Sequence, residues 1–397
     1  MRWSYLLAVP ALIVIVVVVQ LLRPIPPITM QVTAPTSFTA QGPSVNVPWP
    51  TAGQSALAIS GVGLVGSSGA TAPQPIASLA KMMVAYVVLQ DHPLPVGQDG
   101  PTVAVTAQDV ALYQSDLKSG QSVVPVAAGE SLTERQMLEG LLLPSGNNIA
   151  SLMAAWDAGS ESAFVAKMNA EAKSLGMTNT HYADASGLSA ATVSTAVDQL
   201  KVAEAAMNIQ AFAETAALPQ ATLPVAGLVY NVDGFLGRSG IIGVKTGSTT
   251  AAGGCFVAAA NATVAGKQVL VLAAVLGQGG IQPLNAALTA GESLVNSAKP
   301  LLTTVQPVAA GQVAATLTAP WAAPVHLTVA SSPTFIGWNG FVGSERVTGT
   351  PSFSRSVPNG AAAGTLAVTL GQQQAALPLK TSGSINPPGL RWRLTRR

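Results

Sequence analysis

Residues 75–86 constrain the chain most, because they join a nucleophile pattern to a long apolar run. Ser78 precedes Lys81 by three residues, and residues three apart share a helix face, so the amine can reach the hydroxyl. The apolar neighbours Leu79 and Met82 predict a dry setting, which lowers the pKa of Lys81 and favours its neutral form. The segment therefore predicts a helix that begins near an activated serine nucleophile.

Two plainer interpretations stay open at this point. Ser78 alone also fits an ordinary helix N-cap, with the Lys81 side chain extending toward solvent. The same S-x-x-K spacing recurs at Ser115 and Lys118, in a polar stretch of Gln, Ser and Gly that predicts a solvated turn. One S-x-x-K does not separate catalysis from capping.

Composition excludes several classes of protein and site. Charged residues make up 9% of the 397 residues, against about 25% in typical soluble domains. The net charge is +2 with no basic stripe, so we expect no nucleic-acid partner. Cys255 is the single cysteine and lies in an apolar stretch typical of an unreactive buried thiol. The three histidines lack metal spacing, so we expect no metal site.

The N-terminal region predicts attachment and a spacer. An apolar run over residues 6–22 approaches the about 17–25 residues that cross a bilayer, so we interpret 1–23 as a membrane anchor. A cleaved signal peptide is the alternative, and the protein is then secreted. Both interpretations place the rest of the chain outside the cytoplasm. Residues 24–50 are rich in Pro, Thr and Ser, which predicts an extended linker.

The middle of the chain predicts one α+β domain over residues 51–300. Residues 55–60 and 64–66 form a hairpin pattern, and short links between three later apolar segments favour an antiparallel sheet. Helices between the early hairpin and the late strands indicate a sheet that joins both ends of the domain. Ser131 and Glu134 have capping-box spacing at the start of one helix. The expected helices cover 131–143, 149–158, 161–175, 195–208 and 282–298, and the strands 243–248, 253–260 and 268–277.

The last part of the chain predicts a small all-β domain over residues 301–397. Residues 314–318, 325–329 and 365–370 alternate in strand fashion, with Pro, Gly and Ser between them. Residues 390–397 alternate apolar and basic side chains. This tail fits a terminal strand with solvated arginines, or a contact with an anionic surface.

Two further motifs follow the first. Ser145 and Asn147 stand in a turn composition after Pro144, which predicts a hydroxyl and an amide on a tight turn between helices. Lys245 and Thr246 then precede Gly247 in a strand, where glycine allows another backbone to approach. A substrate could add to this strand edge. A capping turn and a solvated lysine are the plain alternatives.

In combination, the three motifs resemble the set found in penicillin-binding proteins and serine β-lactamases, S-x-x-K, S-G-N and K-T-G in order. Residues 75–90, 130–147, 176–198 and 245–255 are similar to the D-alanyl-D-alanine carboxypeptidases, the low-molecular-mass penicillin-binding proteins. The resemblance covers about 55–298. It implies the antiparallel-sheet catalytic fold of that family, followed by a small β domain.

The resemblance also implies roles for the residues that match the motifs. Ser78 attacks the carbonyl between two terminal D-alanines of a peptidoglycan stem peptide, and Lys81 is the general base. Ser145 and Asn147 relay protons and orient the substrate amide. The predicted substrate-binding residues are Lys245 and Thr246 for the terminal carboxylate, Gly247, and Ser248, whose N–H completes an oxyanion hole with that of Ser78. β-Lactam antibiotics are expected to form a long-lived ester, and the resemblance implies no metal or organic cofactor.

Some positions depart from the family pattern, and other functions use the same groups. Asn148, Ser248 and Val193 stand where the family usually has an aspartate, a larger residue and a histidine. A DD-endopeptidase uses the same residues. A class A β-lactamase needs a further glutamate, for which Glu214 is the candidate, although it lacks the E-x-x-L-N form. A non-catalytic wall-binding protein with a relic site is the remaining alternative.

Overall fold

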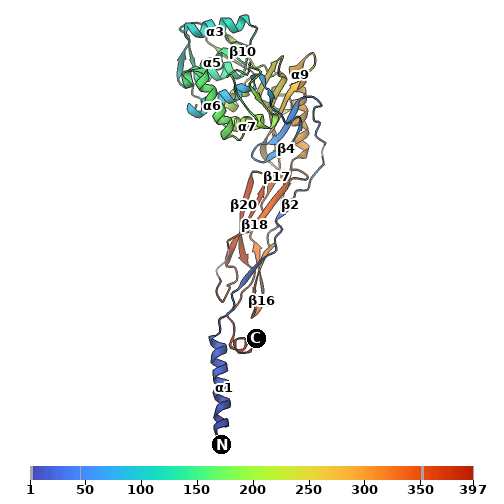
Figure 1. The fold of residues 1–397 in the computed structure, drawn as a ribbon. Helices are drawn as coiled ribbons and strands as arrows, with labels where there is room; N and C mark the ends of the chain where they lie inside the picture. The colour runs from blue at the N-terminus through green and yellow to red at the C-terminus, as the bar shows by residue number, and fades with distance from the viewer. Residues whose placement is uncertain (1–2, 45, 350–352, 397) are drawn as a thin grey trace. The chain divides into compact units, whose positions relative to one another are not determined.

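The computed structural model describes residues 3–44, 46–349 and 353–396, with side chains from residue 8 onward (Figure 1). The chain forms two compact units. One contains Pro43–Leu302, and the other joins Met1–Gly42 to Thr303–Arg397. The larger unit includes the predicted catalytic domain of 51–300, whereas the smaller unit is built from both ends of the chain.

A five-stranded antiparallel sheet organises the larger unit, and it joins both ends of that unit as predicted. Its strands, in spatial order, are β11 (Ile241–Thr249), β12 (Gly253–Val264), β13 (Lys267–Gln278), β3 (Gln54–Ile59) and β4 (Gly63–Gly69). Because side chains alternate along a strand, Phe256 packs against Gly291 of α9 (Pro283–Ala298), whereas Cys255 and Val257 belong to the opposite core.

That core surrounds α2 (Ala80–Asp91), which follows the short η1 turn (Ala77–Leu79). Ten consecutive residues of α2, from Ala80 to Leu89, are buried. A helix that is apolar on every side needs partners on every side. Those partners are α4 (Glu134–Leu142), α5 (Asn147–Ala158), α6 (Glu161–Ser174), α7 (Ala196–Met207) and α8 (Gln210–Ala216).

The remaining elements of the larger unit are short, apart from one helix. They are β5 (Gln74–Pro75), β6 (Thr102–Ala104), α3 (Ala107–Lys118), β7 (Ser131–Thr133), β8 (Val193–Ser194), β9 (Gln220–Leu223), β10 (Gly227–Tyr230), η2 (Arg238–Gly240) and η3 (Lys299–Leu301).

Two local predictions in this unit were wrong. Residues 115–118 end α3 instead of forming a solvated turn, because Thr106 and Asp109 form a capping box at the start of that helix. The box expected at Ser131 lies two residues later, at Thr133 and Gln136. Ser131 instead pairs with Ala104 in the small sheet of β6 and β7.

The smaller unit contains a seven-stranded sheet whose edges come from the N-terminal segment. Its order is β1 (Thr29–Val32), β15 (Val313–Ala319), β16 (Ala322–Val329), β20 (Gln373–Thr381), β19 (Ala362–Leu370), β18 (Val342–Thr348) and β2 (Ser37–Thr39). A separate pair joins β14 (Thr303–Val305) to β17 (Phe335–Gly337).

The prediction of an unpacked linker over 24–50 was therefore wrong for 29–32 and 37–39. β1 pairs with β15, and β2 pairs with β18, both antiparallel. Met30 and Phe38 pack against the core of this unit. Each segment presents a single apolar side chain to that core, which is too short a pattern to stand out among prolines and threonines.

Within the smaller unit, the C-terminal tail contacts the C-terminal end of the first helix. The tail forms the helix α10 (Leu390–Thr395), not a strand with solvated arginines. This helix contacts α1 (Trp3–Leu22). Arg396 donates to the carbonyls of Gln20 at 3.0 Å and Pro24 at 3.0 Å, and Arg393 donates to that of Leu21. These carbonyls lie at the end of α1, where cations are stabilised.

The described part of the chain contains no helix that is both long enough and apolar enough to cross a membrane. Residues 1–2 of the expected anchor lie outside the described residues.

Candidate active site

Ser78 and Lys81 are in direct contact where η1 passes into α2. Lys81 Nζ lies 2.9 Å from Ser78 Oγ, 2.6 Å from Asn147 Oδ1 and 3.0 Å from the carbonyl oxygen of Ser186. Neither η1 nor α2 uses a side-chain hydrogen bond as its N-cap, so the capping interpretation of Ser78 was wrong. The first motif forms the contact that its spacing predicts.

The environment of Lys81 favours an amine that accepts a proton. Burial lowers its pKa well below 10.5, the charge of Lys245 lowers it further, and Asp184 opposes the shift. The oxygens of Asn147 and Ser186 that contact Nζ can only accept hydrogen bonds, so they take both N–H groups of a neutral amine. The lone pair is then left to face the Ser78 hydroxyl.

The turn before Ser78 is held in an unusual conformation. Ala77 has φ +49°, in the left-handed region that residues with a Cβ rarely occupy. Gly187 makes room for it, since an added Cβ there meets the Ala77 carbonyl oxygen at 1.8 Å and Gly187 itself has φ +77°. The backbone thus turns the Ser78 side chain, which is half-buried, toward Lys81.

The second motif lies on the predicted turn between helices. Ser145 sits between α4 and α5 with φ +64°, and Asn147 is the first residue of α5. Asn147 joins two groups, because its Oδ1 accepts from Lys81 and its Nδ2 donates to Gln121 Oε1 at 2.7 Å. Ser145 Oγ is buried and has no hydrogen-bond partner within the described residues.

The third motif places a second buried lysine on β11. Lys245 is 2% exposed, and its Nζ donates to the Thr246 carbonyl at 3.0 Å. Burial lowers the pKa of Lys245 to about 7, with the carboxylate of Asp233 opposing the shift. The lysine is therefore not solvated, contrary to the plain alternative.

Gly247 allows a close approach, but by a segment of this same chain. An added Cβ there lies 2.9 Å from Ser78 N and 3.1 Å from Ala77 Cβ. The strand β11 and the nucleophile turn are thus packed directly together. Ser248, the next residue, is exposed beside Ser78.

An open cleft of about 280 Å³ is lined by one residue from each of the first two motifs and by the residue that follows the third. Ser78, Asn147 and Ser248 line it, whereas Lys81, Lys245, Ser145 and Thr246 are buried. The remaining lining residues are Ser119, Gly120, Gln121, Ser122, Gly187, Leu188, Thr249 and Thr250. The arrangement presents one activated hydroxyl and several polar groups to an extended ligand.

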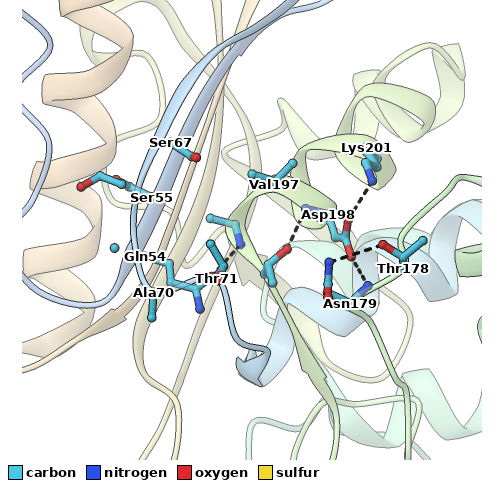
Figure 2. A pocket seen from close by; sticks show the side chains of 14 residues that line it. Gln54, Ser55, Ser67, Ala70, Thr71, Thr178, Asn179, Val197, Asp198 and Lys201 are labelled. Atoms are coloured by element: carbon cyan, nitrogen blue, oxygen red, sulfur yellow. Dashed lines mark hydrogen bonds and ion pairs between the residues drawn. The ribbon is translucent and has the colours of Figure 1, made fainter.

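A second pocket, of about 220 Å³, lies between β4 and the start of α7 (Figure 2). Asp198 on its wall accepts from Lys201 Nζ at 2.8 Å and from the backbone N–H of Asn179 at 2.8 Å. None of the eight predicted site residues lines this pocket. Because no residue of the three motifs reaches this pocket, we assign the chemistry to the cleft at Ser78.

Sequence reasoning missed three residues that bond to a site residue or shift the pKa of a site lysine. Gln121 bonds to Asn147, and the polar stretch around it was the available signal. Asp184 and Asp233 act on Lys81 and Lys245 through space, which no local pattern indicates.

Three residues singled out in the sequence have structural explanations. The Asn148 side chain bonds to both backbone groups of Val124. Its Oδ1 accepts from the Val124 N–H and its Nδ2 donates to the Val124 carbonyl, each at 2.9 Å. Cys255 is fully buried and burial raises its pKa to about 11, as expected for an unreactive thiol. Glu214 on α8 accepts from Gln210, one turn earlier on that helix.

Comparison with known proteins identifies the family. The D-alanyl-D-alanine carboxypeptidase family matches residues 60–279, more than half of the chain. The chain belongs to this family. All three motifs lie inside the matched range, and the family membership makes the protein a serine-type peptidase.

Relatives in the family have two kinds of name. The D-alanyl-D-alanine carboxypeptidase DacB2 of Mycobacterium tuberculosis is 40% identical over 210 residues, covering 51% of this chain and 67% of that protein. A D-alanyl-D-alanine carboxypeptidase of Streptomyces sp. strain K15 is 35% identical, covering 49% and 69%. A D-alanyl-D-alanine endopeptidase of Pseudomonas aeruginosa is 34% identical over 191 residues, covering 46% and 58%.

Solved structures agree with the fold. The D-alanyl-D-alanine carboxypeptidase DacD from Francisella tularensis is similar over 87% of this chain and 96% of that one, with a TM-score of 0.63 and 20% identity. The Streptomyces K15 DD-transpeptidase is similar over 65% and 98%, with a TM-score of 0.54 and 26% identity. The predicted α+β catalytic fold is confirmed, and the further sheets fit the second, all-β part.

Proposed function

We propose that this protein is a D-Ala-D-Ala carboxypeptidase that removes the terminal D-alanine of peptidoglycan stem peptides through an acyl-enzyme on Ser78. The contact of 2.9 Å between Ser78 Oγ and the buried Lys81 amine carries the proposal. A neutral amine whose two N–H groups bond to Asn147 and Ser186 is suited to take the serine proton.

Acylation forms a bond between Ser78 Oγ and the carbonyl carbon of the penultimate D-alanine. Lys81 takes the serine proton, and the C–N bond to the terminal D-alanine breaks. The leaving amine receives a proton through Ser145, whose hydroxyl has no other partner within the described residues. Asn147 orients the substrate amide from its place between Lys81 and Gln121.

Groups beside the same cleft bind the two negative charges of the reaction, which are the terminal carboxylate and the oxyanion. Lys245 and Thr246 hold the terminal carboxylate, and the backbone N–H groups of Ser78 and Ser248 stabilise the oxyanion. The packing of Gly247 against Ser78 supports this, because it places the end of β11 beside the nucleophile. Water then releases the acyl group. A β-lactam acylates Ser78 in the same way and remains as an ester.

A DD-endopeptidase is the second candidate, because relatives such as that of Pseudomonas aeruginosa carry this name at 34% identity. It applies the same groups to a cross-link instead of a free terminus.

We also propose an extracytoplasmic location, since peptidoglycan lies outside the cytoplasmic membrane. Fractionation of cells that express the full chain, beside a chain without residues 1–23, tests this. Full chain recovered with cytoplasmic proteins contradicts the location.

The function is tested by labelling the full chain with fluorescent penicillin while D-alanine release from a D-Ala-D-Ala peptide is measured. We expect both in the wild type and neither in Ser78→Ala. Ser115→Ala, in the other S-x-x-K, is the matched control and is expected to keep both. Labelling without release, together with cleavage of cross-linked muropeptides, favours the endopeptidase. Labelling with neither cleavage indicates a relic site, and a folded wild type that takes no label refutes the serine mechanism.

A further inference from the structure

The end of α3 holds a carboxylate and an amide side by side, and the proposed reaction leaves this pair unexplained. Asp116 is 9% exposed, and its Oδ1 accepts from Gln121 Nε2 at 3.1 Å. The backbone brings the two residues together, because the Gln121 N–H donates to the Asp116 carbonyl at 3.0 Å. Gly120, with φ +69°, donates to the Leu117 carbonyl at 3.0 Å. These two bonds and the left-handed glycine form a Schellman motif, which fixes Gln121 against Asp116.

Gln121 is also fixed against the second motif. The Asn147 N–H donates to the Ser122 carbonyl at 2.8 Å, so the segment after α3 is bonded to the start of α5. Asn147 Nδ2 donates to Gln121 Oε1 at 2.7 Å, and Asn147 Oδ1 accepts from Lys81 Nζ at 2.6 Å. Four side chains therefore form one chain of hydrogen bonds, in the order Asp116, Gln121, Asn147 and Lys81.

The chemistry of Asp116 sets the direction of this chain. An ionised carboxylate has only acceptors, so the Gln121 amide nitrogen must face Asp116 and the Gln121 oxygen must face Asn147. The Asn147 nitrogen must then face Gln121, which leaves the Asn147 oxygen for Lys81. Burial raises the pKa of Asp116, and the bond from Gln121 opposes that shift because it favours the ionised form. The carboxylate thus decides which end of the Asn147 amide faces Lys81.

This direction matters for the nucleophile. A neutral Lys81 amine has two N–H groups and one lone pair, and the oxygens of Asn147 and Ser186 take both N–H groups. If the Asn147 amide turned over, its nitrogen would donate to the lone pair or lie against an N–H group of the amine. The lone pair would then no longer face the Ser78 hydroxyl.

We propose that Asp116 and Gln121 are positioning residues that fix the direction of the Asn147 amide and thereby leave the lone pair of Lys81 to face Ser78. The catalytic part of this inference rests on the proposed function. Asp116 acts only through Gln121, without contact with the reacting atoms. It lies inside the second S-x-x-K of the sequence, so that stretch serves the first one without supplying a nucleophile.

The first test exchanges the two groups in the double variant Asp116→Asn with Gln121→Glu. The carboxylate then stands at position 121 and the amide at position 116, so each donor still meets an acceptor and the total charge is unchanged. Acylation of Ser78 by fluorescent penicillin and the kcat and KM of D-alanine release are measured at pH 7 for the full chain.

Gln121→Glu alone sets two carboxylates against each other, so we expect acylation and kcat to fall about tenfold or more, with KM changed less. Asp116→Asn alone permits both directions of the chain, and a smaller loss of about threefold is expected. The exchanged variant should recover to within about threefold of the wild type.

Gln210→Glu is the matched control. It sets a second carboxylate beside Glu214 on α8, where the bond of 2.9 Å between Gln210 and Glu214 lies outside the chain that ends at Lys81. Acylation and kcat should be unchanged in this variant. A folded exchanged variant that is as slow as Gln121→Glu overturns the proposal, and so does a Gln121→Glu protein that is acylated at the wild-type rate.

Gln121→Leu replaces Gln121→Glu if the latter does not fold. It removes the acceptor for Asn147 Nδ2 without adding a charge, so the amide can turn over. Acylation should again fall about tenfold. Acylation of Gln121→Leu at the wild-type rate overturns the proposal.

Melting of the wild type, the two single variants and the exchanged variant needs no activity. Gln121→Glu should lower the Tm of the larger unit by about 2–4 °C, and the exchanged variant should regain most of the loss. A regained Tm in a protein whose wild type releases no D-alanine supports the hydrogen-bond chain but refutes the carboxypeptidase. D-alanine release by the wild type, without recovery of acylation in the exchanged variant, refutes the role of Asp116 and Gln121 and leaves the carboxypeptidase standing.

Discussion

At the scale of single residues, burial decides the charge of Lys81 and Lys245. Both side chains are at most 2% exposed, and desolvation lowers the pKa of each. The proposed roles need opposite charges, because a general base must be neutral whereas a carboxylate-binding lysine must be cationic. The two lysines repel each other when both are charged. This repulsion favours the state in which Lys245 carries a proton and Lys81 is neutral.

This arrangement predicts a bell-shaped pH dependence of D-alanine release. We expect kcat/KM to rise on the acid side as Lys81 loses its proton, well below pH 10.5, and to fall above about pH 7 as Lys245 loses its own. Lys245→Arg keeps a permanent cation, so its alkaline limb should lie at higher pH. A rate that climbs steadily from neutral pH to about pH 10 contradicts the assignment.

Glu134 gives a second residue-scale prediction, this time for stability. It is 1% exposed, and burial raises its pKa to about 7 from 4.5, with Arg135 opposing the shift. Because the folded pKa is the higher one, the protonated carboxyl stabilises the fold fully below pH 4.5, and this stability is lost as the pH rises through about 7. Glu134→Gln should therefore stabilise the protein by about 2 kcal/mol at pH 8.

Urea unfolding of both proteins at pH 8 and at about pH 4.5 measures that difference. The gain should disappear at the lower pH. A gain of equal size at both pH values means that packing, not ionisation, is responsible.

At the scale of elements, the start of α4 shows how neighbouring patterns compete. Both Ser131 and Thr133 have the spacing of a capping box, with Glu134 and Gln136 as their partners. Pairing of β7 with β6 takes Ser131 into a strand, so Thr133 caps the helix and Gln136 bonds back to the N–H of Thr133 at 3.0 Å. The helix then ends at the turn that presents Ser145.

Thr133→Ala is therefore expected to lower the free energy of unfolding by about 1 kcal/mol, the usual cost of a lost N-cap. Ser131→Ala, two residues earlier and exposed, should change it by less than about 0.5 kcal/mol. Chemical unfolding of both variants provides the comparison. Equal losses, or a larger loss for Ser131→Ala, place the cap at the residue that the first pattern indicated.

At the scale of the whole molecule, one unit is built from the first and last parts of the sequence, and the other unit from the residues between them in the sequence. The two N-terminal strands occupy both edges of the seven-stranded sheet, β1 beside β15 and β2 beside β18. Without β1 and β2, the backbone groups along the outer sides of β15 and β18 would remain unpaired. The smaller unit therefore needs residues from before the catalytic unit to complete its sheet.

Removal of residues 1–42 should lower the melting temperature of the smaller unit by about 4 °C or more, because both sheet edges are then uncovered. The larger unit keeps its sheet and core, so its transition and the reaction at Ser78 should persist. Scanning calorimetry with parallel D-alanine release checks both. A chain without residues 1–24 keeps both strands and is the control. Identical melting of all three chains contradicts a stabilising role for β1 and β2.

The sequence by itself determined the features that depend on near neighbours. Spacing of three places Lys81 beside Ser78, and strand alternation predicts the sheet that joins the two ends of the larger unit. The hydroxyl of Ser145 and the amide of Asn147 lie on the predicted turn for the same reason. Such patterns act over a few residues, where backbone geometry sets which side chains share a face.

Only the tertiary structure decided what depends on distant groups. The action of Asp233 on Lys245, the bond of Gln121 to Asn147 and the pairing of β1 with β15 join segments that no local pattern relates. Charges interact through a dry interior over several ångströms, and a strand edge pairs with whichever backbone the fold brings beside it. Both effects depend on positions in space, which the chain acquires only when it folds.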